Sequence, residues 1–165
     1  MKCSYKPASE AEIIRRCDKD IAENSGDISW VYWKAELLEM NQNGMCKTFV
    51  VLYGDDPIGE GTLLFSPECD AVFGRTELAD GITVANINAL RIDKQHEGKG
   101  HISELIKNME RYAGDNGYEA LTIGVEAKEA RNLAIYLHWG YNELVLHEIE
   151  NDSLVLYYSK RLSES

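Results

Sequence analysis

The sequence lacks the residue pairs that hold zinc or carry out dithiol chemistry. Its four cysteines form no Cys-x-x-Cys pair. Zinc cages and redox dithiols depend on such pairs, so the sequence argues against both. We therefore expect Cys3, Cys17, Cys46 and Cys69 to be reduced thiols buried in the protein.

Long hydrophobic runs are also missing. The longest apolar stretches, such as Phe49–Tyr53, are far shorter than the roughly 20 residues that a membrane-spanning helix needs. Residues 1–7 contain no apolar core of a secretion signal. We therefore expect a cytoplasmic protein that makes no contact with a membrane.

Positive charge is scarce. The chain has 17 lysine and arginine residues against 28 aspartate and glutamate residues, so its formal net charge is −11. Such a surface repels nucleic-acid phosphates and anionic lipids. The composition therefore argues against nucleic-acid binding and favours a cationic partner.

Length and composition predict one domain. The chain has 165 residues, which is the size of a single ordinary domain. Its 44% of hydrophobic residues supply a core without disulfides or a structural metal. One domain over residues 1–165 is therefore expected.

Hydrophobic spacing and turn residues predict a mixed α/β chain. Ser9 and Glu12 form a capping box that opens the first helix, and apolar positions recur at helical or alternating spacing further along. Residues 67–80 are acidic and irregular, and the whole order predicts a mixed sheet that carries helices. We expect helices at 9–24, 27–41, 101–114 and 128–139, and strands at 2–6, 48–53, 58–65, 83–92, 120–125, 141–149 and 153–159.

Aromatic residues gather at the start of the second expected helix. Trp30, Tyr32 and Trp33 could belong to the core, as aromatic residues at helical spacing usually do. They could also form a wall for a bound acceptor molecule. The sequence leaves both readings open.

A glycine-containing loop joins the strand that ends near Ile92 to the helix that follows. Gly98 and Gly100 lie in this loop, where unpaired amides and the positive helix end can point at one diphosphate. A Walker loop is excluded, because Gly100 is not followed by Lys-Ser or Lys-Thr. A dinucleotide-binding fingerprint is excluded, because its third small residue is missing.

Segment 97–102 resembles the coenzyme A loop of the GNAT superfamily of acetyl-CoA-dependent N-acetyltransferases. The family pattern is Arg or Gln, two residues, Gly, one residue, and Gly or Ala. We prefer the frame that begins at Glu97 over the one that begins at Gln95, because it keeps the spacing to Ile92 and to the following helix. In that frame Glu97 replaces Arg or Gln, and Ile102 replaces Gly or Ala.

A later segment carries the second resemblance. Tyr136, followed by Gly140 and Tyr141, is similar to the pattern of tyrosine, glycine and an aromatic residue in the family's late helix. The resemblance extends along essentially the whole chain. It implies a GNAT-like α/β fold, with a mixed, mainly antiparallel sheet, helices on both faces and a splayed central pair of strands.

The resemblance also implies that the protein binds acetyl-CoA as its acetyl donor. Main-chain groups of Leu90 and Ile92 would pair with the pantetheine arm like an added strand. Asn132, one helical turn before Tyr136, would stand in for an asparagine that the family often has earlier in this helix. The implied coenzyme contacts are Leu90, Ile92, Glu97, Gly98, Lys99, Gly100, His101, Ile102 and Asn132.

The implied reaction transfers the acetyl group to an amine. Tyr136 would give a proton to the departing thiolate, and Asn88 would orient a water that relays the amine proton. Relatives carry a glutamate on the strand before the loop, and this chain has none there. The sequence does not identify the general base. Four acidic residues are candidates, although each is otherwise expected to be a solvated surface charge: Glu36, Glu60, Glu77 and Asp80.

The chemical class of the acceptor is inferred from the net charge alone. An acidic surface favours a small cationic amine, such as an aminoglycoside-like sugar, a polyamine or an amino acid derivative, or a peptide. A non-catalytic module that holds coenzyme A or another ligand as a sensor is the alternative, and an enzyme that modifies another protein is a third. The closing hairpin at 141–160 could join a second copy in a homodimer.

Overall fold

A computed structural model describes residues 2–163 of the chain. Their contacts form two compact units. The first unit comprises the chain up to Thr62 together with Ala89–Met109, and the second comprises Leu63–Asn88 and the chain from Glu110 onward. A single domain over residues 1–165 stays a prediction.

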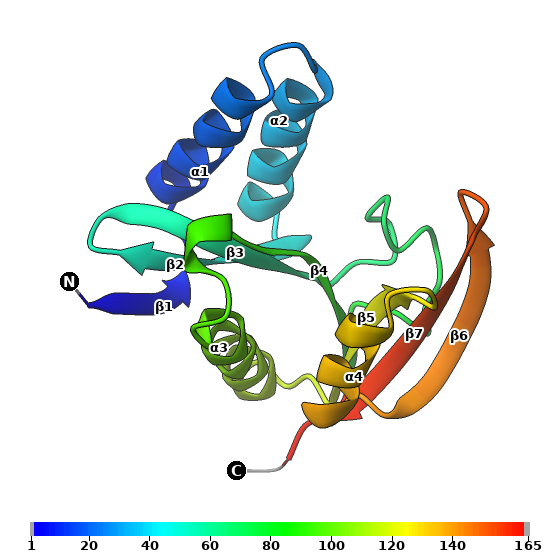
Figure 1. Cartoon of the computed structure of the whole chain (residues 1–165). Helices are drawn as coiled ribbons and strands as arrows, with labels where there is room; N and C mark the ends of the chain where they lie inside the picture. Colours follow the sequence, from blue (N-terminus) through cyan, green and yellow to red (C-terminus); the bar gives the residue numbers. More distant parts are fainter. Residues whose placement is uncertain (1, 164–165) are drawn as a thin grey trace. The chain divides into compact units, whose positions relative to one another are not determined.

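The elements follow the predicted order. Figure 1 shows them in chain colours, and the strand order in the seven-stranded sheet is β1-β2-β3-β4-β5-β7-β6. The element bounds are β1 Cys3–Pro7, α1 Glu10–Glu23, α2 Ser29–Gln42, β2 Cys46–Tyr53, β3 Asp56–Leu64, β4 Val84–Ile92, a short 3-10 helix Lys94–His96, α3 His101–Asp115, β5 Ala120–Glu126, α4 Ala130–His138, β6 Glu143–Glu150 and β7 Ser153–Arg161.

The first unit has helices on both faces of its strands. In Figure 1, α1 and α2 lie on one side of β2 and β3, and the start of α3 lies on the other. Neighbouring residues of β3 show the same division. Glu60 accepts a hydrogen bond from Arg16 of α1, whereas a Cβ at Gly61 would lie 3.1 Å from the sulfur of Met109 on α3.

The start of α1 confirms the predicted capping box. The amide of Glu12 donates to Oγ of Ser9 at 3.2 Å, and the amide of Ser9 donates to Oε1 of Glu12 at 2.8 Å. Both amides would otherwise lack partners at the helix start. Ile13 and Cys17, one turn apart, then bury the apolar face of the helix.

The second unit contains a parallel pairing of two strands. β4 pairs with β5 in parallel from Val84–Ala120 to Ile87–Ile123, and the pairs β5–β7 and β6–β7 are antiparallel. Beyond the last parallel pair, β4 continues to Ile92 and β5 continues to Glu126. The mixed, mainly antiparallel sheet is therefore confirmed, and β4 and β5 are the central pair that the resemblance implied.

Two details differ from the sequence-based expectations. Cys17, Cys46 and Cys69 are buried and form no disulfide, but Cys3 is half-exposed because it lies on β1, an edge strand of the sheet. Tyr32 is 67% exposed, because α2 buries only Leu37 and Met40. The core reading is therefore wrong for this tyrosine. Among the described residues, no helix is long and apolar enough to cross a membrane.

Candidate functional site

The glycine loop has the backbone that its sequence predicts. After β4 the chain makes the 3-10 turn Lys94–His96, is extended at Glu97, and enters α3 at His101. Gly98 and Gly100 have φ values of 75° and 81°, a conformation that L side chains rarely adopt. Apart from the chain neighbours, no described residue has an atom within 4 Å of the position that a Cβ would take at either glycine, so the surface around the loop is open.

The amides of this loop are the candidate binding groups. The amide of Glu97 donates to the carbonyl of Lys94 at 3.2 Å, and the next amide with a partner is that of Glu104, which donates to the carbonyl of Gly100 at 3.1 Å. Between them, the amides of residues 98–103 find no acceptor within the described part of the chain. They stand at the positive end of a 15-residue helix. Such a cluster suits a diphosphate.

The loop's charged side chains leave this cluster open. Glu97 and Lys99 are both exposed, and neither forms an ion pair or a side-chain hydrogen bond with any residue that the structure describes. Lys99 is therefore available to a bound phosphate, and Glu97 is not tied against the amides. Ile102, where the family has Gly or Ala, is half-buried.

The His101 ring anchors the start of α3. Its Nδ1 lies 2.8 Å from the hydroxyl oxygen of Tyr5, and its Nε2 lies 4.0 Å from the sulfur of Cys3. Burial, with smaller contributions from nearby acidic groups, raises the pKa of the Tyr5 phenol. The imidazole is thus engaged with β1, so the group that His101 offers to a ligand in the amide cluster is its backbone N–H.

The last residues of β4 expose main-chain groups away from β3. The amide of Asp93 donates to the carbonyl of Ile58 at 2.7 Å, so Asp93 faces β3. Because main-chain groups alternate sides along a strand, those of Leu90 and Ile92 point to the opposite edge. Their side chains pack over glycines of β3, where a Cβ at Gly61 would lie 2.8 Å from Leu90.

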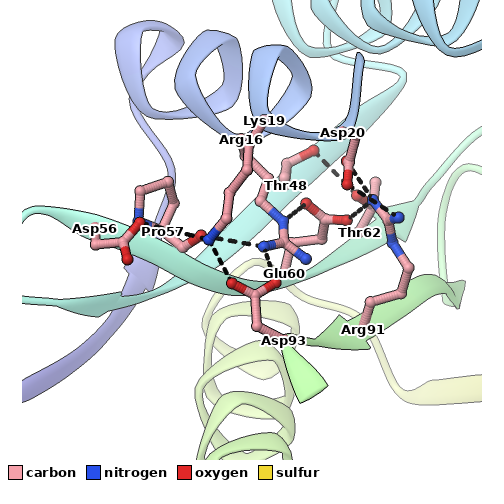
Figure 2. Close-up of polar contacts among 10 residues, drawn as sticks. All are labelled: Arg16, Lys19, Asp20, Thr48, Asp56, Pro57, Glu60, Thr62, Arg91 and Asp93. Carbon is pink, nitrogen blue, oxygen red and sulfur yellow. Dashed lines mark hydrogen bonds and ion pairs between the residues drawn. The ribbon is translucent and has the colours of Figure 1, made fainter. Parts of the chain in front are cut away.

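Glu60 is a buried ion-pair residue, so its expected place on the solvated surface is wrong. Figure 2 shows it between two arginines: Nε of Arg16 donates to Oε2 at 2.8 Å, and Nη2 of Arg91 donates to Oε1. Burial pushes the pKa of Arg91 down, but Glu60 and Asp20 more than offset this and raise it. With both oxygens held by guanidinium groups, Glu60 is a poor general base.

Asp80 is also removed from the set of possible bases. Its carboxylate accepts hydrogen bonds from the amides of Ile82, Thr83 and Val84 and from the Thr83 hydroxyl, at 2.6 to 2.9 Å. Burial raises its pKa, but these bonds outweigh burial and lower it to about 2. Asp80 therefore organises the turn before β4. Glu77 is exposed, as expected, and Glu36 is half-buried.

The other predicted residues lie in the second unit. Tyr136 is half-buried on α4, and its ring centroid is 5.8 Å from that of Trp139. Burial raises the pKa of its phenol, so the hydroxyl stays protonated at neutral pH, and no described residue forms a hydrogen bond with it. Asn88 is half-buried and Asn132 is exposed.

A strained residue in β4 escaped the sequence analysis. Ala89 has a φ of 52°, which is unusual for a residue with a side chain. It follows Asn88, just after the parallel pairing with β5 ends at Ile87. Alanine is not a residue typical of turns, so this conformation could not be predicted from the sequence.

The model of the Acetyltransferase (GNAT) family matches residues 12–141. A search of curated proteins finds no match. Within the described residues there is also no group of three or more histidine, cysteine or acidic residues that could hold a metal ion.

Three solved structures share the fold. A ribosomal-protein-alanine N-acetyltransferase from Brucella melitensis is 16% identical with a TM-score of 0.70, and the match covers 96% of this chain and 99% of that one. A spermidine N-acetyltransferase chimera from Vibrio cholerae and hSSAT is 16% identical with a TM-score of 0.68, covering 98% and 96%. A GNAT family acetyltransferase from Elizabethkingia anophelis, with acetyl-CoA bound, is 16% identical with a TM-score of 0.57, covering 77% and 82%.

Proposed function

Because the chain belongs to the Acetyltransferase (GNAT) family, we propose that it transfers an acetyl group from acetyl-CoA to a primary amine. The observation that carries this proposal is the cluster of free amides at residues 98–103. These donors follow one another at a helix start, where a diphosphate would gain both hydrogen bonds and the helix dipole. Left-handed glycines at 98 and 100 keep side chains out of that space.

The edge of β4 supports a place for the pantetheine arm. Main-chain groups of Leu90 and Ile92 point away from β3, and an amide-rich arm can pair with them as an extra strand would. Along the chain, these residues directly precede the loop that would hold the diphosphate. One continuous segment, Leu90–Ile102, would therefore bind most of the coenzyme.

Tyr136 is proposed to act as the general acid. As the amine nitrogen bonds to the acetyl carbon, the carbon–sulfur bond breaks and the sulfur takes up a proton. The raised pKa of Tyr136 keeps that proton on the phenol at neutral pH until the thiolate forms. Asn88 is proposed to orient the water that removes the proton from the amine.

The acceptor is proposed to be a small cationic amine or a peptide amino terminus. The net charge of −11 attracts a protonated amine before it is deprotonated for attack. Solved structures of the same fold include a spermidine and a ribosomal-protein-alanine acetyltransferase. Both proposed acceptor classes therefore occur among proteins of this fold.

The test is a thiol-release assay with acetyl-CoA and a panel of amines. The panel would contain spermidine, an aminoglycoside, an amino acid amide and a peptide with a free amino terminus. We expect at least one of these amines to cause release of the free coenzyme A thiol. Acetyl-CoA binding without release on any amine would instead support a sensor, and no binding at all would refute the proposal. Cytoplasmic location and a homodimer stay predictions.

A further inference from the structure

The end of β4 is joined to α1 by charged side chains. Arg16, Lys19 and Asp20 are spaced i, i+3 and i+4, so they share one face of α1. Arg91 and Asp93 are two residues apart and turn to the same face of the sheet. Figure 2 shows the two sets meeting over β3.

Asp93 is held by both of its carboxylate oxygens. Nη1 of Arg16 donates to Oδ1 at 2.6 Å, and Nζ of Lys19 donates to Oδ2. The same Nη1 reaches the carbonyl of Pro57 at 3.1 Å. Burial raises the pKa of Asp93, but the bonds from Lys19 and Arg16 outweigh it and lower the pKa. Asp93 therefore stays ionised and fixed.

The backbone of Asp93 sets where the coenzyme loop begins. Its amide donates to the carbonyl of Ile58 at 2.7 Å, and its carbonyl accepts from the amide of His96 at 2.9 Å. The first bond attaches the residue to β3, and the second closes the 3-10 turn that leads to Glu97. Any displacement of Asp93 would therefore carry the following amides with it.

The ion-paired side chains around Asp93 carry no excess of positive charge, so they cannot attract the coenzyme strongly. Every cation is paired with a carboxylate, which leaves little net charge to act on a diphosphate. The side chain of Arg16 is also only 6% exposed. The three cations are Arg16, Lys19 and Arg91, and the four carboxylates are Asp20, Asp56, Glu60 and Asp93.

We propose that Asp93 is a positioning residue for coenzyme binding. Arg16 and Lys19 hold it so that the amides of residues 98–103 keep one arrangement before the ligand arrives. A loop that is already ordered loses less conformational freedom when it binds. This inference rests on the proposed function, because it concerns the same loop.

Lys19→Met tests the proposal with a matched control. The Lys19 side chain is 27% exposed, so the variant should fold, and it removes one of the two cations on Asp93. Lys34→Met is the control: Lys34 is 28% exposed and pairs with Asp18 at 2.6 Å rather than with Asp93. Lys19→Arg keeps a cation in place and serves as the rescue.

Two measurements separate this inference from the proposed function. Hydrogen exchange of the amides of residues 98–103, without ligand, should speed up in Lys19→Met and stay at the wild-type rate in Lys34→Met and Lys19→Arg. Calorimetry with coenzyme A should show about tenfold weaker binding for Lys19→Met alone. In turnover assays its KM for acetyl-CoA should rise while kcat stays within about twofold, since the reacting groups are unchanged.

The inference is wrong if Lys19→Met matches the Lys34→Met control in exchange and in affinity while the wild-type protein binds coenzyme A. If the wild-type protein does not bind coenzyme A, the proposed function fails. The exchange rates alone then decide whether Lys19 and Asp93 order the loop.

Discussion

Substitution of Gly100 by glutamate should have two effects: backbone strain that lowers stability, and repulsion of the coenzyme diphosphate that weakens binding. Gly100 and Gly117 have φ values of 81° and 88°, and a Cβ at either would meet no described atom within 4 Å beyond its chain neighbours. Either substitution therefore costs about 1–2 kcal/mol of stability from the left-handed backbone alone. For a protein of this size that corresponds to about 2–8 °C in Tm. Gly117→Glu, beyond the far end of α3, is thus the matched control.

Only Gly100→Glu should also weaken coenzyme binding. A carboxylate about 4 Å from one phosphate charge is repelled by about 1 kcal/mol even in bulk water. The repulsion of a doubly charged diphosphate is therefore about 2 kcal/mol. That is about thirtyfold in Kd, and more if the site excludes water. Thermal unfolding and calorimetry with coenzyme A measure the two effects. Equal coenzyme affinities for the two glutamate variants would refute our placement of the diphosphate.

Three further predictions concern the second unit. Tyr136→Phe should lower kcat at least about tenfold with little change in coenzyme affinity, and unchanged turnover would remove the phenol from the mechanism. Asp80 has a pKa lowered from 3.8 to about 2, so its contribution to stability is present above about pH 4 and is lost between there and about pH 2. Denaturant unfolding of Asp80→Asn should lack that part of the pH dependence; an identical pH profile would contradict the assignment. Gly124→Ala should cost about 1–3 kcal/mol, because its Cβ would lie 2.6 Å from the Tyr157 ring. A Tm equal to that of the wild type would show that the ring moves aside freely.

The elements and the loop were predictable because their signals are local. Ser9 and Glu12 lie three residues apart, and their bonds form within one helical turn. The glycines of the loop have a similarly local signature, because their positive φ values need no distant partner.

The charged residues were misread because their partners are distant in the sequence. Glu60 is buried between Arg16 and Arg91, which are 44 and 31 residues away. A glutamate without such partners belongs on the surface, which is why the sequence suggested a solvated charge. The burial of Tyr32 could not be predicted either. Its helical spacing is typical of a core residue, but the side chain is exposed.

Coenzyme binding is proposed to depend most on the amides of residues 98–103, which would hold the diphosphate. Amide NMR of the whole protein, titrated with coenzyme A and separately with pantetheine, tests this directly. We predict that coenzyme A shifts the amide signals of Gly98 through Ser103, and that pantetheine, which lacks the diphosphate, leaves them in place. Binding of coenzyme A with those signals unmoved would contradict the account.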